Sequence, residues 1–512
     1  MKRLHFILVF LLLSSAVSAY DAKIDGIYYY FNNEEKTATV TFQQKGWYTY
    51  SSDYSGNITI PSEVVWKKVT YKVVNIGEHA FDNSDQLISV TIPNNITSIG
   101  MYAFQGCDKL SSVNISEGLI SIDSCCFLSC KNLSNINIPN TVTTIKGRAF
   151  HNCTGLTSIV IPSSVIHIGP RIFSGCNNLA TVELQNEMST IPIEMFLGCN
   201  NLSSITIPAS VTSIEEYAFG GCSFTSLNLP QNLNSIGESA FHSCSKLETI
   251  DIPNSVSTIG KYAFCECTAL KKILISRGIT SIDVDPFLRC SSLTVIIVDN
   301  ENPVYDSRNN CNAIIETASN KLLIGCKASV IPESVTSIGA MAFNECTGLT
   351  SIVIPNSVVE IGYAAFSQCG NLSSVILPEN IASIGEGVFF KCSCLKSIGI
   401  PKNVNYIGKK AFYGCYFSQV TSLNPVPPEV GEDGLYPQNN STLYVPVGSK
   451  ASYENAEVWK NFTNIVEGNL SGIDVLTNEK EKDFPIYDLN GVRQNVIRKG
   501  INVIGGKKVV IK

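Results

Sequence analysis

Charged residues are scarce in this chain, and the two signs are nearly balanced. Asp, Glu, Lys and Arg together make up 16% of its 512 residues, and the formal net charge is only −6. Nucleic-acid binding usually needs a clustered basic surface, so this composition argues against nucleic acid as a partner. The hydrophobic fraction of 44% is too high for a disordered chain and predicts a folded protein.

The motifs of common catalytic and cofactor sites are also lacking. The sequence contains no Gly-x-Ser-x-Gly elbow, no His-Glu-x-x-His pair and no phosphate-binding loop. Its 5 histidines are scattered, and neighbouring carboxylates such as Glu215 and Glu216 recur at no fixed spacing, which is typical of solvated loop charges. We therefore expect no enzyme activity and no catalytic, cofactor-binding or metal-binding residues.

Long uninterrupted apolar runs are absent from the sequence, except for one close to its first residue. Lys2 and Arg3 precede a mainly apolar segment at 5–13, and small residues follow at 17–19, as in a secretory signal peptide. A membrane anchor is the alternative, but the apolar run is shorter than the ~20 residues that a spanning helix needs. We predict cleavage after Ala19 and export of a mature chain without a membrane span, either secreted or held at the outer cell surface.

A 23-residue periodicity dominates the rest of the sequence. A phenylalanine recurs at this interval, with one interval of 22 residues and one gap of 56. Self-similarity at a fixed spacing of this length indicates a solenoid, in which each repeat packs only on its neighbours. The periodic residues are Phe81, Phe104, Phe127, Phe150, Phe173, Phe196, Phe219, Phe241, Phe264, Phe287, Phe343, Phe366, Phe389 and Phe412.

One repeat, residues 156–176, shows how each coil is built. Its first third alternates buried apolar and outward positions, which is typical of a short strand, and Pro162 ends that strand. Gly169 suits a tight corner, and the last third predicts one short helical or 3-10 turn. We therefore predict a repeat solenoid, with a parallel β-sheet of short strands and short helical or 3-10 turns.

The two ends of the chain depart from the repeat. Residues 20–62 predict an N-terminal β cap, in which β-prone runs flank a hairpin signal at Asn32-Asn33. The solenoid is expected over residues 63–425, and a C-terminal cap over residues 426–470. Caps at both ends, rich in β-structure, would cover the apolar faces of the terminal coils.

An extended repeat at about residues 291–332 fills the gap in the phenylalanine spacing. Residues 310–315 and residues 321–324 are two β-prone runs around polar turn residues. They predict a hairpin that projects from the array.

Three short motifs recur through the repeats: a Leu-x-x-Ile-x-Ile-Pro strand, a Val-Thr-x-Ile-Gly corner as in residues 335–339, and an Ala-Phe-x-x-Cys closure. In these motifs the chain resembles the BspA-like leucine-rich repeats of bacterial surface proteins. The resemblance covers about residues 60–425, and the insertion around Tyr305 and residues 311–315 is also similar to a feature of that family. It implies surface exposure, adhesion to host matrix or cell-surface proteins, and association with other microbes, without fixing one ligand.

The last segment, residues 471–512, is set apart from the repeats. Asn490-Gly491 and Gly505-Gly506 lie between β-prone runs and predict hairpin turns. The segment resembles the short C-terminal β modules by which some Gram-negative anaerobes route proteins through an outer-membrane secretion system, which implies sorting or anchoring. The alternative is a small terminal sheet without a sorting role.

Most of the 19 cysteines follow the repeat, three residues after a periodic phenylalanine. Neighbouring coils lie ~4.8 Å apart with parallel side chains, whereas a disulfide needs converging Cβ atoms at ~3.5–4.5 Å. We therefore expect a ladder of free, buried thiols that act as small hydrophobes, and four zinc ligands cannot converge from a straight ladder. Cys311 and Cys326 lie outside this ladder, and a disulfide between them is the alternative to two free thiols.

The outward residues of the strands form the candidate ligand-binding face. In the first part of the array they are mostly small and polar, but over residues 272–376 each outward pair includes an apolar residue. A contiguous exposed apolar patch usually marks an interaction site. The alternative is that the insertion or neighbouring loops cover it. The candidate residues are Lys272, Leu274, Val295, Ile297, Val353 and Ile376.

These observations predict a secreted or cell-surface protein that binds or adheres to proteins or glycans of the host matrix or of other cells. The alternative is a structural or self-associating surface protein without a dedicated host ligand. Concentration-dependent assembly in the absence of any host ligand would favour that alternative. The sequence indicates no particular oligomeric state.

Overall fold

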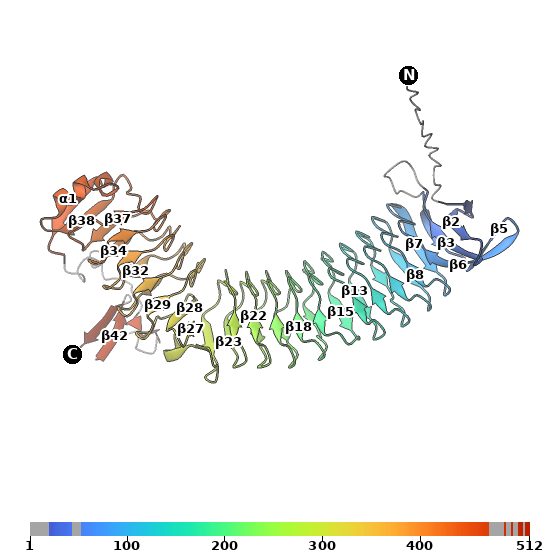
Figure 1. The fold of residues 1–512 in the computed structure, drawn as a ribbon, viewed down its shortest axis with the longest axis horizontal. Coiled ribbons are helices and arrows are strands. Elements are labelled where there is room, and N and C mark those ends of the chain that lie inside the picture. Colours follow the sequence, from blue (N-terminus) through green and yellow to red (C-terminus); the bar gives the residue numbers. More distant parts are fainter. Residues whose placement is uncertain are drawn as a thin grey trace, which may run out of the picture. The chain divides into compact units, whose positions relative to one another are not determined.

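Each repeat folds into one coil of a β-solenoid, and successive coils stack through parallel hydrogen bonding (Figure 1). The computed structural model describes residues 20–43 and 53–470, together with four short strands between residues 486 and 511. The predicted leader, with its cleavage after Ala19, lies outside the described residues. The chain divides into two units, residues 1–186 and residues 187–512, which we call unit 1 and unit 2.

A coil has three sides, and the coil that begins at Leu156 shows them. The first side is the strand β13 (Ser158–Ile161), in which Ile159 and Ile161 are buried and the two residues between and before them face outward. The second is a two-residue corner strand, β14 (His167–Ile168). The third is a series of turns that leads to the phenylalanine and cysteine of the repeat. We call the sheet of first-side strands the open sheet.

Unit 1 contains the open-sheet strands β4 (Ser55–Thr59), β7 (Gln86–Ile92), β9 (Ser112–Ile115), β11 (Asn135–Ile136), β13 and β15 (Thr181–Leu184). Its corner strands are β6 (Val69–Ile76), β8 (Ser98–Ile99), β10 (Ser121–Ile122), β12 (Thr144–Ile145) and β14. Corner strands of neighbouring coils pair in parallel, with residues 23 apart in register, so each coil repeats the geometry of the last.

Unit 2 continues the same plan. Its open-sheet strands are β17 (Ser204–Ile205), β19 (Ser226–Asn228), β21 (Thr249–Asp251), β23 (Lys272–Ile275), β25 (Val295–Val298), β30 (Ser351–Val353), β32 (Ser374–Ile376), β34 (Ser397–Ile400), β36 (Gln419–Ser422), β38 (Thr442–Pro446) and β39 (Asn464–Gly468). Its corner strands are β16 (Thr190–Ile191), β18 (Ser213–Ile214), β20 (Ser235–Ile236), β22 (Thr258–Ile259), β24 (Ser281–Ile282), β29 (Ser337–Ile338), β31 (Glu360–Ile361), β33 (Ser383–Ile384), β35 (Tyr406–Ile407) and β37 (Glu429–Val430).

Antiparallel strands precede the first coil of unit 1. Strands β1 (Ala22–Ile24), β2 (Ile27–Asn32) and β3 (Thr37–Thr41) form a meander, and β3 then pairs in parallel with β6. The expected turn around Asn32-Asn33 therefore joins two antiparallel strands. A second hairpin consists of β5 (Glu63–Trp66) and the start of β6.

The third side differs in detail from a helical turn. Two residues of each coil, placed two before and two after the phenylalanine, adopt a positive φ, as Tyr102 (57°) and Gly106 (65°) do around Phe104. This alternation directs every second peptide N–H at the next coil: Phe104 N–H donates to the carbonyl of Cys126 at 2.8 Å, and Gly106 N–H to that of Leu128 at 2.8 Å. The third side is therefore itself a hydrogen-bonded ladder between coils.

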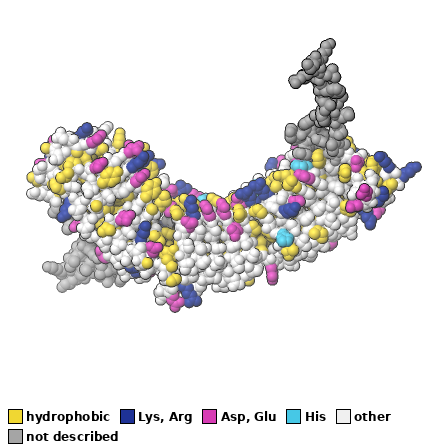
Figure 2. Space-filling view, viewed as in Figure 1, with side chains coloured by type: hydrophobic (Ala, Val, Ile, Leu, Met, Phe, Trp, Pro, Cys, Tyr) yellow, Lys and Arg dark blue, Asp and Glu magenta, His cyan; other side chains and the backbone are white. Residues whose placement is uncertain are grey.

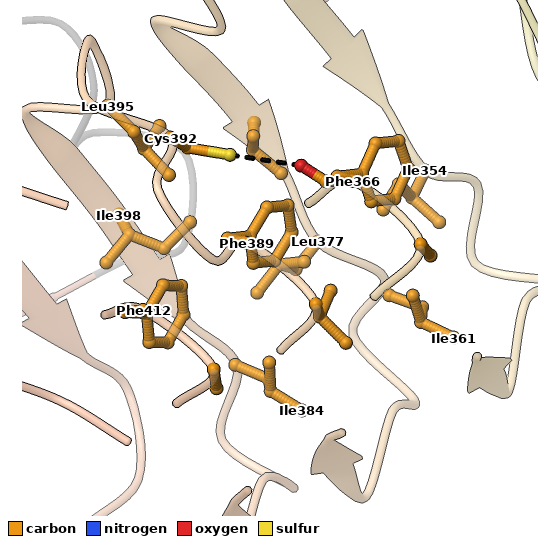
Figure 3. Close-up of a cluster of buried hydrophobic side chains, with 14 of the residues drawn as sticks. Ile354, Ile361, Phe366, Leu377, Ile384, Phe389, Cys392, Leu395, Ile398 and Phe412 are labelled. Atoms are coloured by element: carbon orange, nitrogen blue, oxygen red, sulfur yellow. Dashed lines mark hydrogen bonds between the residues drawn. The ribbon is translucent and has the colours of Figure 1, made fainter. Parts of the chain in front are cut away.

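The phenylalanines of the repeat are buried and stack on one another, as Phe366, Phe389 and Phe412 do in Figure 3, and all the repeat cysteines except the half-buried Cys346 are buried as well. Ring centroids of Phe366 and Phe389 lie 5.5 Å apart in near-parallel planes. The Cys392 thiol donates to the carbonyl of Phe366 at 3.1 Å, a contact that most repeats share. All 19 cysteines are free thiols, as expected for the ladder, and burial raises the pKa of Cys176 to about 12. The repeat selects cysteine because a small apolar side chain with a weak donor fits that carbonyl.

The extended repeat is a hairpin, but it does not project from the array as expected. Strands β27 (Ala313–Glu316) and β28 (Lys321–Gly325) pair in antiparallel fashion, and β28 then pairs in parallel with the corner strand β29. Ile314, Ile315 and Leu322 are fully buried. The short strand β26 (Tyr305–Asp306) and the 3-10 turn η1 (Arg308–Asn310) lead into this hairpin. Burying these apolar residues is the physical reason that the hairpin joins the core.

The C-terminal end of the array includes a helix that the sequence did not suggest. Helix α1 (Lys450–Asn455) and the 3-10 turn η2 (Trp459–Asn461) lie between β38 and the last open-sheet strand, β39. Trp459 is fully buried, and its indole N–H donates to the carbonyl of Pro428 at 2.8 Å. These residues fill the end of the last coil with aromatic side chains.

In the final segment the structure describes only backbone strands: β40 (Ile486–Tyr487), β41 (Arg493–Gln494), β42 (Gly500–Ile504) and β43 (Lys507–Ile511). They pair in antiparallel fashion in the order β41-β40-β42-β43. The predicted turns at Asn490-Gly491 and Gly505-Gly506 lie outside the described residues.

Candidate functional site: the outward face of the open sheet

The strands β23 and β25 present the first candidate residues side by side. Their inward residues are buried, whereas Lys272 and Ile297 are exposed and Leu274 and Val295 are half-buried. The parallel register places Lys272 opposite Val295 and Leu274 opposite Ile297. The alternation of a strand therefore sends all four side chains to the outward face, as predicted.

The strands β30 and β32 bring the other two candidates together. Val353 lies opposite Ile376 in the parallel register, with Ser351 opposite Ser374 one step earlier. The side chain of Val353 is exposed and that of Ile376 is half-buried, while Ile352 between Ser351 and Val353 is buried.

Sequence reasoning missed one residue of this face, Val330. Its peptide N–H donates to the carbonyl of Cys311 at 3.0 Å, and its side chain is 62% exposed. Val330 precedes Pro332 by two residues, as Val353 precedes Pro355 in the next repeat. The spacing to the proline could have identified Val330 as an outward residue. It was overlooked because Cys326 occupies the position at which the strand motif has leucine. Together the outward residues Leu274, Ile297, Val330, Val353 and Ile376 form what we call the apolar row.

The extended repeat does not cover the apolar row. Ile297 is 39% exposed and Val353 36% exposed, and these two residues lie before and after the insertion in sequence. The hairpin turns its apolar side chains to the core and leaves Val330 open. On the face shown in Figure 2, hydrophobic side chains are frequent over the segments that Figure 1 colours yellow to orange, and fewer over the green ones.

Charged groups stand at the edge of the row and not within it. Lys272 is exposed, and its neighbour Lys271 forms an ion pair with Glu248 at 2.6 Å, so that charge is already partnered within the array. Screened pairs of this kind contribute little to binding energy. Recognition at the row would therefore depend on apolar contact, with the Ser351 and Ser374 hydroxyls beside it.

Cys311 and Cys326 are near each other in the insertion but do not form a disulfide. The Cys311 thiol donates to the carbonyl of Ala313 at 3.7 Å, and the Cys326 thiol to that of Asn312 at 3.4 Å. Burial raises the pKa of Cys311 to about 11 and also raises that of Cys326. Both thiols therefore serve packing in this structure.

The described part of the chain offers no arrangement for metal chemistry. Among those residues, no group of three or more His, Cys, Asp or Glu side chains converges as ligands would. Likewise, none of the helices in residues 20–43 and 53–470 has the length and hydropathy that crossing a bilayer requires.

Comparison with known proteins identifies the repeat. The family described as "BspA type Leucine rich repeat region" matches residues 74–203, 189–312 and 321–427, in 6 copies. No curated protein matches the chain.

Solved structures of bacterial repeat proteins are similar to the chain. A leucine-rich repeat protein from Bacteroides ovatus is 28% identical, with 78% of this chain and 94% of that protein covered and a TM-score of 0.54. A leucine-rich cell surface protein from Faecalibacterium prausnitzii is 26% identical over 89% of this chain and 97% of that protein, with a TM-score of 0.34. The pneumococcal vaccine antigen PcpA is 16% identical over 88% of this chain and all of that protein, with a TM-score of 0.33.

Proposed function

The chain belongs to the BspA-type leucine-rich repeat family of bacterial surface proteins, and from this premise we propose that it is a non-catalytic adhesin. It would be secreted or held at the outer cell surface, and it would bind proteins or glycans of the host matrix or of other cells. The ligand would dock on the apolar row of unit 2.

The observation that carries this proposal is the exposure of the apolar row. In β9, the outward residues Ser112 and Asn114 are polar, which is what a solvated sheet face requires. At the same positions of β25, Val295 and Ile297 are apolar, and Ile297 is exposed. The register pairs Leu274 with Ile297 and Val353 with Ile376, and neighbouring exposed apolar side chains of this kind usually mark an interaction site, which favours the row as the place where a ligand docks.

A pair of charge-introducing variants tests the proposal. The full chain and Leu274→Asp/Ile297→Asp are compared for binding to immobilised host matrix proteins, mucins and glycans. We expect saturable binding to one class of ligand, weakened by about tenfold or more in the variant, because buried carboxylates would oppose the contact. Ser112→Asp/Asn114→Asp is the matched control, since it adds the same charge to the outward face of unit 1.

Two outcomes would contradict the proposal, the first at the level of the site and the second at the level of the function. Equal binding by the two variants, with both folded, would remove the apolar row as the site. No binding to any ligand, with concentration-dependent assembly in sedimentation that Leu274→Asp/Ile297→Asp abolishes, would instead favour a self-associating surface protein.

A further inference from the structure

The β5–β6 hairpin of unit 1 ends in an unusual turn. Residues Glu63 to Trp66 pair with Lys72 to Val69, so that Lys67 and Lys68 alone connect the two strands. Both lysines adopt a positive φ, 49° and 65°. Two central residues with positive φ define the type I′ turn, whose favoured sequences are Asn-Gly and Asp-Gly, because side chains other than those of Gly, Asn and Asp are strained there.

The neighbouring hairpin shows the expected solution to the same geometry. Strands β1 and β2 are also joined by two residues, Asp25 with φ 49° and Gly26 with φ 86°. Unit 1 therefore contains the favoured pair in one turn and two lysines in the other. Conformation does not account for lysine at the tip, which directs attention to its charge.

A third lysine with a positive φ lies beside this hairpin. Lys36, at φ 54°, is in the β2–β3 turn, and its carbonyl accepts a hydrogen bond from Lys72 N–H at 3.0 Å. The contact holds the β2–β3 turn against β6. Four lysines, Lys36, Lys67, Lys68 and Lys72, thus cluster at one end of unit 1, and we call them the lysine cluster.

An aromatic cluster underlies two of these ammonium groups. Lys67 Nζ lies 4.0 Å from the centre of the Trp66 ring, and Lys36 Nζ lies 5.9 Å from that of Tyr71. The Trp66 ring stacks on Phe31 with centroids 4.6 Å apart and lies 6.2 Å from the ring of Tyr71. The rings position the charges and leave them at the surface.

The lysine cluster has no carboxylate partner among the described residues. None of its four members takes part in an ion pair, although Glu63 is the register partner of Lys72 and Glu34 and Glu35 lie in the β2–β3 turn. Along the array, in contrast, several lysines pair with a carboxylate of the preceding coil, as Lys146 pairs with Asp123 at 2.9 Å and Lys131 with Asp108 at 3.0 Å. The cluster therefore gathers four exposed positive charges that no ion pair occupies within the described residues of unit 1, and these charges are available to an outside partner.

We propose that the lysine cluster binds a linear, sulfated or carboxylated polysaccharide. Lys68 and Lys72 are about 13 Å apart along the hairpin, the length of four residues of strand, and Lys36 lies beside the hairpin, so the cluster matches charges that repeat along a chain. Ammonium groups supply the attraction to the anionic groups, and the edge of Trp66, which is half-buried, supplies apolar contact to the sugar rings, whereas Tyr71 lies in the core beneath it. This site differs in place and chemistry from the apolar row.

The test uses retention of the full chain on immobilised heparin, with elution by salt. The variant Lys67→Asn/Lys68→Gly removes two charges and installs the favoured turn sequence. We expect its affinity for heparin to fall by about tenfold and its thermal stability to stay the same or rise. Lys67→Arg/Lys68→Arg keeps the charge and should keep the affinity. Lys246→Asn/Lys402→Asn is the matched control: it removes two exposed lysines of unit 2, which form no ion pair within the described residues, and should bind as the parent does.

Trp66 provides an independent readout. Heparin should change the tryptophan fluorescence of the parent protein, because it draws the Lys67 ammonium group away from the Trp66 ring, and Trp66→Phe should abolish that change. Elution of Lys67→Asn/Lys68→Gly and the control variant at the same salt concentration would overturn the proposal. So would binding to phosphatidylglycerol vesicles without binding to heparin, because the partner would then be a membrane surface.

Discussion

Strand β9 of unit 1 and strand β25 of unit 2 are built alike on the inside and differently on the outside. Strand β9 buries Val113 and Ile115, and strand β25 buries Ile296 and Val298 at the matching positions. The outward residues are polar in the first strand and apolar in the second. Stacking constrains the inward residues of every coil, because each must fit its neighbours, whereas stacking leaves the outward residues free to vary.

Units 1 and 2 also differ in whether the stack of phenylalanine rings is interrupted. In unit 1 the rings from Phe81 to Phe173 stack in an unbroken series, with centroid distances of 4.8 to 5.7 Å. In unit 2, Phe343 stacks on Phe366 at 4.9 Å, but on its other side lies Gly325, where a Cβ would be 2.0 Å from the ring. The extended repeat thus replaces a ring by glycine backbone.

Truncating a ring should give the largest effect and sharpen this contrast. Phe104→Ala leaves a cavity between two stacked rings, and we expect it to lower the free energy of unfolding by about 3–5 kcal/mol. Phe343→Ala should cost less, because only one neighbouring ring loses its partner. Urea denaturation followed by circular dichroism measures both. Equal costs would mean that the glycine backbone supports Phe343 as well as a ring does.

A buried carboxyl group next to the interruption should give an intermediate, pH-dependent effect. Burial raises the pKa of Asp285 to about 6, against the opposing hydrogen bond from Asn344 at 3.5 Å. The folded state therefore holds this proton more tightly than the unfolded chain. Its contribution to stability is complete below the ordinary carboxyl pKa of about 4 and is lost as the pH rises to about 6 and above.

Substitution at Asp285 isolates this contribution. Asp285→Asn should flatten the decrease in melting temperature between pH 4 and pH 7, as measured by thermal denaturation of the full chain. Asp283→Asn, which removes an exposed carboxylate two residues earlier, should leave the decrease unchanged. If the melting temperatures of the parent and of Asp285→Asn depend on pH in the same way, this carboxyl group is not the source of the decrease in stability.

Exchanging outward residues should have the smallest effect on stability. Ser112→Val/Asn114→Ile gives β9 the apolar outward pair of β25, and we expect the free energy of unfolding to change by no more than about 0.5 kcal/mol. Urea denaturation again provides the measurement. A decrease of several kcal/mol in the free energy of unfolding would contradict the contrast between inward and outward residues, because the outward face would then contribute to folding in unit 1.

The periodic residues allowed much of the fold to be predicted. A phenylalanine every 23 residues specifies a stacked column, and alternation within a strand specifies which residues face outward, so the side chains of Leu274 and Ile297 could be placed correctly. The free thiols also followed from coil spacing. The hydrogen bond from most of the repeat cysteine thiols to a phenylalanine carbonyl could not be predicted, because it depends on the detailed path of the third side.

Less of the structure could be predicted where the 23-residue periodicity is interrupted. The hairpin of the extended repeat could be predicted from its β-prone runs, but its place in the core depends on the pairing of β28 with β29, which no local pattern encodes. The positive φ values of the third side occur at residues as different as Tyr102, Arg148 and Gly387, so no residue type signals them. Val330 was missed because Cys326 replaces the leucine that begins a repeat.

The ladder on the third side has a mechanical consequence. Within each unit, most coils are held by hydrogen bonds and ring contacts to the coils directly before and after them, so tension on a unit would detach its coils one at a time from an end. A freed coil of 23 residues adds about 75 Å of extended chain. If the protein is an adhesin, it would lengthen in steps under shear, as one coil after another detaches. The coils that remain stacked would still expose their binding faces.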